Sequence, residues 1–263
     1  MLFRILRRSI GEMKKDNVIT VVRLVIGLTL WYLSSFIFKT YFASAFPAAV
    51  APVLSSMVVP YTAGLGLFLL ATFGMPKSAP AEDGLSAAYI LKAFVVQNGI
   101  AFPLMIASNM ICMLLFRIKS EGMGEEQLFG GMWWFYAVLL LVFNPVFEEL
   151  LYRKLVIDRL SGFDNNAKVI CSALLFAVPH VLSVGVPAMF FAFGMGLVWG
   201  FVYTRQGKLW PAVLLHALGN LMGSYIPLAL SLVHPACQVL FIMCTVGVCV
   251  PLTVVILTYK KKG

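Results

Sequence analysis

Charged residues are scarce in this chain of 263 residues: they make up 12% of it, and only 11 residues are acidic. Apolar residues make up 61%, whereas a soluble globular domain usually has about 45–50%. This composition excludes an ordinary soluble domain. It predicts an all-α polytopic membrane protein.

Paired cysteines and glycosylation acceptors are also missing. The five cysteines all lie in apolar segments and form no Cys-x-x-Cys pair, which argues against a disulfide framework or a zinc knuckle. The net charge is +9. The basic residues lie between apolar segments and at both ends of the chain, as topology-setting charges do. We therefore expect a lipid bilayer and no nucleic acid as a partner. The short loops and the lack of Asn-x-Ser/Thr fit a bacterial cytoplasmic membrane.

Eight apolar segments reach the roughly 20 residues that cross a bilayer. With the N-terminus in the cytoplasm and the intramembrane Arg23 and Arg153 set aside, only Lys39, Arg117 and Lys119 fall on the opposite side. This asymmetry favours an even number of spans with both termini cytoplasmic. Seven spans, the second interpretation, would put one basic terminus outside. The eight segments lie near residues 18–40, 48–74, 88–117, 132–157, 168–184, 186–204, 208–231 and 235–258.

The chain is predicted to have four parts. Residues 1–17 combine regularly spaced apolar residues with a basic side, which is typical of an amphipathic helix lying on an anionic leaflet. The other parts are three accessory transmembrane helices over 18–130, a core of helices four to seven over 131–232, and a last transmembrane helix with a basic tail over 233–263.

Two adjacent carboxylates, Glu148 and Glu149, lie with Arg153 in the fourth apolar segment. Charges in a bilayer cost several kcal/mol, roughly, and usually serve a function. At about 100° per residue, Glu149 and Arg153 share a helix face and can pair. Glu148 points away from both. We therefore expect Glu149 and Arg153 to brace the helix and Glu148 to be available for chemistry.

Two histidines lie in later apolar segments with polar or aromatic company. Phe176 precedes His180 by one helical turn, and Asn220 follows His216 by one turn. Ionisable groups on three different spans suggest a single assembled site. Elsewhere, Asn98 and Asn109 are expected to bond between helices, and Gly219 and Gly223 would let another helix approach closely.

These residues match a family pattern. Glu-Glu-x-x-x-Arg, Phe-x-x-x-His and His-x-x-x-Asn, in that order on successive spans, resemble the CPBP family of intramembrane proteases. That family includes the type II CAAX prenyl endopeptidases and relatives linked to bacteriocin immunity. The resemblance covers roughly residues 131–232.

The resemblance implies hydrolysis of a peptide bond in a membrane-associated peptide or protein, prenylated or of the leader type, without a cofactor. Catalysis would fall to Glu148 and His180, which act on a water, and to His216 and Asn220, which stabilise the oxyanion. Glu149, Arg153 and Phe176 would support them. A desolvated carboxylate holds a proton more readily than one in water, which suits Glu148 to general-base work.

Other functions remain open at this point. Glu148, His180 and His216 also form a ligand set for catalytic zinc, although the chain has no His-Glu-x-x-His. A proton-coupled transporter would use the same acids and histidines as a relay, but it would be expected to have repeat-related halves. A non-catalytic membrane scaffold would keep the fold alone.

Overall fold

The computed structural model describes residues 15–80, 84, 86–117 and 124–259. All regular secondary structure in these ranges is helical, as predicted. The expected interfacial helix over 1–17 lies outside the described residues, apart from the last three. Those three begin α2 (Lys15–Ile37).

Eight helices in the described ranges are long and apolar enough to cross a membrane, which confirms the prediction of eight spans over seven. The boundaries differ most in the first span, which was expected to end at residue 40 and extends to Ala45. The spans are Asp16–Ala45, Ala51–Ala71, Ala87–Phe116, Trp133–Ile157, Asn165–Leu182, Val186–Gln206, Trp210–Val233 and Pro235–Thr258. The chain is an integral multi-pass membrane protein.

Several helix ends follow from local sequence. Ser86 caps α5 (Ala87–Ile111) by accepting a hydrogen bond from the Tyr89 backbone N–H at 3.2 Å, which satisfies one of the donors left open in a first turn. Proline stands in the first turn of α12 (Trp210–Asn220) and α14 (Pro235–Thr258). Its missing N–H costs nothing there, since first-turn donors have no partner within the helix.

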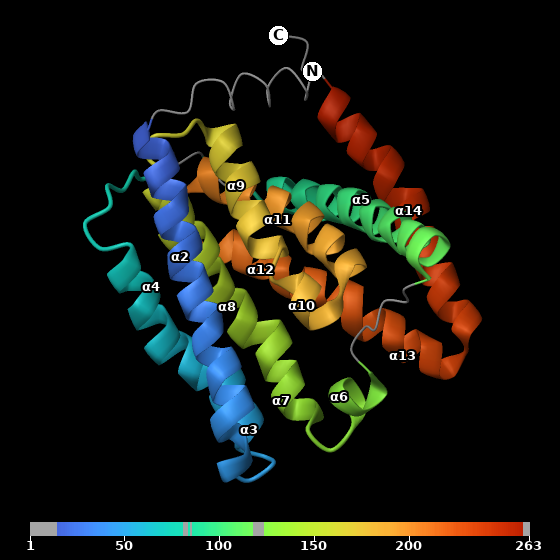
Figure 1. Ribbon diagram of the computed structural model, residues 1–263. Helices are drawn as coiled ribbons and strands as arrows, with labels where there is room; N and C mark the ends of the chain where they lie inside the picture. Colours follow the sequence, from blue (N-terminus) through green and yellow to red (C-terminus); the bar gives the residue numbers. More distant parts are fainter. Residues whose placement is uncertain (1–14, 81–83, 85, 118–123, 260–263) are drawn as a thin grey trace. The chain divides into compact units, whose positions relative to one another are not determined.

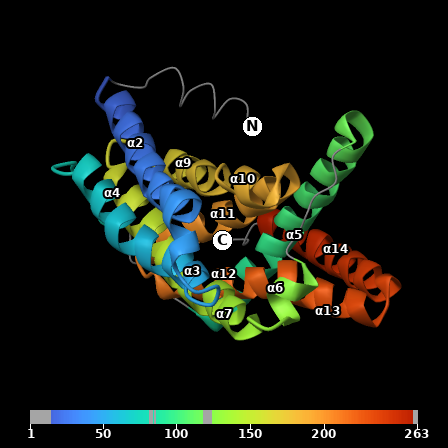
Figure 2. The ribbon, with the colours of Figure 1, turned by 60° about the horizontal axis from the view of Figure 1, so that its bottom comes forward.

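The chain divides into two compact units. The first comes from Met1–Ala79 and Leu155–Lys168. In it, α2 packs along α4 (Leu65–Ala71), as Figures 1 and 2 show. The intramembrane Arg23 donates hydrogen bonds to the carbonyls of Ala71 and Phe73 at 3.0 and 2.6 Å. A cation bonded to the last carbonyls of a helix is favourable. The further helical elements of this unit are Phe38–Phe42, Ala43–Ala45, α3 (Ala51–Val53), Leu54–Val58 and Pro60–Gly64.

The second unit, Pro80–Lys154 and Val169–Gly263, contains all the predicted site residues. The α-helices of this part of the chain, besides α5, α12 and α14, are α6 (Glu125–Phe129), α7 (Trp133–Val138), α8 (Asn144–Glu149), α9 (Asn165–Ala177), α10 (His180–Val184), α11 (Val186–Gln206) and α13 (Ile226–Val233). π-helical turns connect some of them, at Cys112–Phe116, Leu139–Phe143, Leu150–Ile157 and Leu221–Tyr225.

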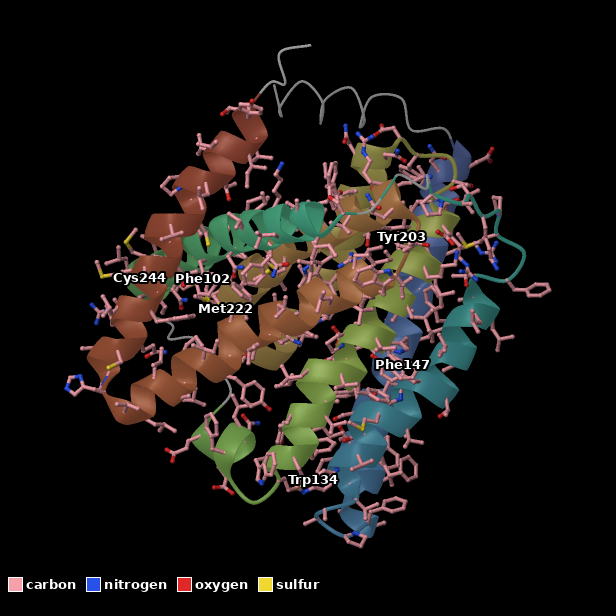
Figure 3. The ribbon with its side chains drawn as sticks, turned by 180° about the vertical axis from the view of Figure 1, so that it is seen from behind. Phe102, Trp134, Phe147, Tyr203, Met222 and Cys244 are labelled. Atoms are coloured by element: carbon pink, nitrogen blue, oxygen red, sulfur yellow. The ribbon has the colours of Figure 1, made fainter. Side chains whose placement is uncertain are left out.

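The most buried span of the second unit is α11, in which 56% of an 18-residue apolar stretch is buried inside the protein. It packs against α5, α10 and α12 (Figures 1 and 2). Phe102 of α5, labelled in Figure 3, meets Phe191 of α11 edge-on, with ring centroids 5.4 Å apart. Only Gly185 separates α10 from α11, at φ +90°, a conformation that a side chain would strain. The core of this unit is therefore built around α11.

Candidate active site

The two carboxylates are the last residues of α8, which continues as the π-helical segment Leu150–Ile157. Arg153 donates from Nε to Oε2 of Glu149 at 2.7 Å, and both side chains are fully buried. The pairing predicted from the i, i+4 spacing is confirmed. A buried ion pair is stable only if further hydrogen bonds satisfy its remaining atoms. Here α9 and α12 supply a partner for Nη1 of Arg153 and for Oε1 of Glu149, whereas the buried Nη2 of Arg153 has no hydrogen-bond partner among the described residues.

Ser172 of α9 is a partner of this pair that the sequence reasoning missed. Arg153 donates from Nη1 to Ser172 Oγ at 2.6 Å, and the hydroxyl donates in turn to the carbonyl of Tyr152 at 2.9 Å. A serine hydroxyl can accept and donate at once, so the two bonds are compatible. Ser172 lies four residues before Phe176, and that spacing on one helix face could have identified it.

His216 of α12 lies between the two carboxylates. Its Nδ1 is 3.0 Å from Oε1 of Glu149, and its Nε2 is 3.8 Å from Oε2 of Glu148. A carboxylate paired with arginine only accepts hydrogen bonds, so Nδ1 carries the proton and donates it to Glu149. In a neutral ring Nε2 then holds the lone pair. This nitrogen faces Glu148.

Glu149 makes one contact that the sequence reasoning did not foresee. It was expected to brace the helix with Arg153, and its second oxygen also accepts a hydrogen bond from His216. Helical spacing within α8 predicts the first contact because that contact is local. The second joins residues 67 positions apart and depends on how α12 packs against α8. Among the described residues, no arginine forms an ion pair with Glu148, which keeps 17% of its side chain exposed, against 0% for Glu149.

Aromatic rings surround these groups. Phe176 is buried. Its ring centroid lies 4.8 Å from that of His180 and 5.8 Å from that of His216. The Arg153 guanidinium lies 5.3 Å from the same ring. Phe176 thus joins all three motifs.

Trp199 of α11 is the second residue that the sequence reasoning missed. Its ring is stacked on His216, with centroids 4.1 Å apart and an angle of 15° between the planes. Gly219, predicted to allow a close approach, makes room for it: a Cβ there would lie 3.2 Å from Cζ2 of Trp199. No motif contains Trp199, and its spacing within α11 is that of any buried residue.

Trp199 is in turn bound by the accessory helix α5. Its Nε1–H donates to Oε1 of Gln97 at 2.8 Å. Asn98, expected to bond between helices, instead donates to the Phe94 carbonyl of its own helix at 2.7 Å. The neighbouring glutamine makes the interhelical contact. Two consecutive polar residues face different sides of a helix, and the packing of α11 selects one of them.

His180 begins α10, directly after the turn at Pro179 that ends α9. Its Nδ1 lies 3.0 Å from the carbonyl oxygen of Phe176. A carbonyl only accepts, so Nδ1 carries the proton and Nε2 the lone pair. Proline removes a backbone donor from this turn and so interrupts the helix. Nδ1 of His180 donates to a backbone carbonyl and Nδ1 of His216 to a carboxylate. Both imidazole rings contact the ring of Phe176.

Asn220 ends α12, one turn beyond His216. Its Nδ2 donates to the carbonyl of Leu140 at 2.8 Å. The sequence predicts an amide directed at substrate, whereas the structure uses one of its N–H groups to tie α12 to the segment that precedes α8. An asparagine amide has two N–H donors, so this bond occupies one of them.

Comparison with known proteins found one family model that covers these motifs. Residues 129–222 match the family model described as type II CAAX prenyl endopeptidase Rce1-like, and all three motifs fall within that match. This match, over about a third of the chain, supports the CPBP/CAAX protease family that the motifs resemble. At family level the match supports an intramembrane endopeptidase of the CAAX type. Neither the search of curated proteins nor the search of solved structures found a match.

In this CAAX-protease-family site, the donors that zinc would need are already partly engaged. Across the described residues, no three histidine, cysteine, aspartate or glutamate side chains are grouped so as to hold a metal ion. Nδ1 of His216 and Nδ1 of His180 face Glu149 and a backbone carbonyl respectively. Zinc would therefore have to use Nε2 of each ring.

Proposed function

We propose that the chain hydrolyses a peptide bond in a membrane-associated substrate, with Glu148 as the general base. The observation that carries this proposal is the unequal setting of the two carboxylates. Glu149 is fully buried and bonded to Arg153 and His216, whereas Glu148 pairs with no arginine in the part of the chain that the structure describes and stays partly accessible. A base must reach the proton that it removes. Of the two carboxylates, only Glu148 combines that access with a place beside Nε2 of His216.

Each step of the reaction has a residue to perform it. Glu148 takes a proton from a water, and the water oxygen attacks the carbonyl carbon of the substrate. The carbonyl oxygen becomes an oxyanion. As the C–N bond breaks, a proton passes to the leaving amine nitrogen, from Glu148 directly or through His180. The products are a free carboxylate and a free amine.

His216 and Asn220 are the groups that we assign to the oxyanion. To donate from Nε2, the His216 ring needs a proton there in addition to the one on Nδ1. Asn220 has the N–H that is not bonded to Leu140. One donor placed at a developing oxyanion is worth about 2.7–4 kcal/mol of transition-state stabilisation. The reaction needs these donors at the carbonyl oxygen of the substrate and Glu148 at the attacking water.

The alternative is a zinc peptidase that uses Glu148, His180 and His216 as ligands. Such an enzyme would lose activity with a chelator and recover it with zinc alone. A glutamate-type enzyme would be indifferent to both. The experiment is to incubate purified protein in liposomes with a chelator, remove the chelator, and measure cleavage before and after adding zinc.

The main test uses a panel of peptides in liposomes that contain the purified protein. The panel has a farnesylated CAAX peptide, the same peptide without the prenyl group, and a leader-type peptide on a membrane anchor. We expect wild-type protein to cleave at least one of them. Glu148→Ala and His180→Ala should abolish cleavage while the protein stays folded. Full activity in Glu148→Ala would contradict the mechanism.

The same panel separates the proposed substrate classes. Cleavage of only the farnesylated peptide would indicate prenylated CAAX proteins, and cleavage of the anchored leader would indicate peptide processing. Comparing the peptides of cell membranes that carry wild-type or Glu148→Ala protein would then identify natural substrates. We infer a bacterial cytoplasmic membrane as the location, and membrane fractionation tests this.

A transporter or a non-catalytic scaffold is the remaining candidate. The family match favours a protease over both. A transporter would move protons or solute across liposomes with Glu148 intact and cleave nothing in the panel. That result would replace the peptidase proposal with a transporter.

A further inference from the structure

The proposed mechanism leaves one buried polar chain of contacts unexplained. It starts at Gln97 of α5, runs through Trp199 of α11 and ends at His216 of α12. Gln97 is 0% exposed, and the other two side chains are each 2% exposed. Gln97 also lies outside the part of the chain that matches the protease family.

The stacked ring of Trp199 fixes the plane of the His216 imidazole. The two rings lie almost parallel at 4.1 Å, and Phe176 meets both edge-on, at 5.6 Å from Trp199 and 5.8 Å from His216. Rotation of the imidazole about its Cβ–Cγ bond would push it into one of these rings. The plane in turn sets where the two ring nitrogens point, which is toward Glu149 and Glu148.

Gln97 fixes the ring of Trp199 and the backbone of His216 together. Its Oε1 accepts from Trp199 Nε1–H at 2.8 Å, and its Nε2 donates to the carbonyl of Leu215 at 3.2 Å. Indole N–H can only donate and a carbonyl can only accept, so a single orientation of the amide satisfies both. Leu215 directly precedes His216. One side chain thus holds both the face and the backbone of the same histidine.

We infer that Gln97 is a positioning residue for the peptidase reaction, acting through Trp199 on the orientation of His216. This inference rests on the proposed function. It gives the accessory helix α5, which packs along α11 and contacts α12 (Figures 1 and 2), a direct part in the geometry of the site. A catalytic group displaced by about 1 Å can cost roughly a hundredfold in rate, so a ring held this closely is sensitive to its support.

The test compares Gln97→Met with Asn98→Leu. Methionine has a similar length and volume but neither accepts from Trp199 strongly nor donates to Leu215. Asn98 is an equally buried amide on the same helix, and its side-chain N–H bonds to the Phe94 carbonyl within α5, so Asn98→Leu is the matched control. With a panel peptide that wild type cleaves, Gln97→Met should lower kcat about tenfold or more at unchanged KM. Asn98→Leu should stay within about twofold of wild type.

A second measurement does not depend on activity. The chain has three histidines, so the ring signals of His216 can be assigned in protein labelled at histidine, by comparison with His216→Gln. The stacked indole shifts these signals upfield. Gln97→Met should reduce that shift, and Asn98→Leu should leave it unchanged.

A double variant keeps the inference falsifiable if Gln97→Met is unstable. Trp199→Phe retains an aromatic ring but removes the N–H that Gln97 accepts. Adding Gln97→Met to Trp199→Phe should lower kcat little further, because the contact is already lost.

Additive losses, a wild-type kcat in Gln97→Met, or equal effects in Asn98→Leu would each overturn the inference. An inactive Glu148→Ala beside a fully active Gln97→Met would overturn the inference alone. If wild type cleaves nothing, the proposed function fails, and the His216 signals still test the positioning.

Discussion

Glu149 accepts a hydrogen bond from His216 at 3.0 Å, although the two residues lie on different helices and belong to different motifs. The contact connects the ion pair of α8 to the histidine on α12. It also fixes the tautomer of His216, because a carboxylate bonded to arginine can only accept. Bracing and catalysis are therefore coupled through one carboxylate.

The first prediction concerns Glu149→Gln. A carboxylate offers two acceptor oxygens, one for Arg153 and one for His216, whereas an amide offers one. Arg153 therefore loses its counter-charge, which costs about 3–5 kcal/mol for a buried pair. If the amide oxygen stays with Arg153, its N–H faces His216, so Nδ1 accepts and the ring proton lies on Nε2. The ring then carries one proton and no charge, and a neutral ring is a weaker donor to the oxyanion than the doubly protonated ring of the proposed mechanism. We expect a lower Tm and a kcat reduced at least about tenfold, measured at a temperature where the variant is folded.

The tautomer of His216 in Glu149→Gln can be read from its imidazole nitrogen signals. A shift of the proton to Nε2 would support the coupling. Wild-type kcat in the folded fraction would mean that Glu149 only braces the helix.

The second prediction is that Ser172→Ala separates stability from catalysis. The substitution removes one hydrogen bond to the Arg153 guanidinium, worth about 1.5–3 kcal/mol, and leaves His216 untouched. Denaturation in detergent should show that loss, and kcat should stay near wild type. If kcat falls as far as in Glu149→Gln, the orientation of Arg153, and not the contact between Glu149 and His216, determines the activity of the site.

The third prediction is made for Asn220→Ala. If its second N–H reaches the oxyanion, kcat should fall about 10²–10³-fold at similar KM. Loss of the bond to Leu140 alone should lower stability by about 1 kcal/mol. Initial rates over a range of peptide concentrations, together with the Tm, distinguish the two. A lower Tm with an unchanged kcat would leave Asn220 as a tie between helices only.

The fourth prediction concerns topology. Eight spans with most basic residues on one side predict that both termini face the cytoplasm. Alkaline phosphatase fused after Gly263 should be inactive, and the same enzyme inserted between Ser120 and Glu121 should be active. The opposite pattern would invert the membrane orientation.

Local spacing in the sequence was enough to predict several features. Apolar length predicted all eight spans, because about 20 apolar residues per crossing is set by bilayer thickness. The i, i+4 rule predicted the bond between Glu149 and Arg153, which lies within one helical turn. The spacing of Phe176 and His180 likewise placed their rings in contact. These features depend on helix geometry and solvent, both of which act on neighbouring residues.

The sequence by itself thus determined a polytopic helical protein, its eight spans and the local contacts of Glu149 with Arg153 and of Phe176 with His180. Only the tertiary structure decided which distant residues pair: His216 with Glu149, Asn220 with Leu140, and Trp199 with Gln97, which are 67, 80 and 102 positions apart in the chain. These pairings follow from the packing of α5, α8, α11 and α12. Each helix has several polar or aromatic positions, and the approach of its neighbour selects the one that forms the contact.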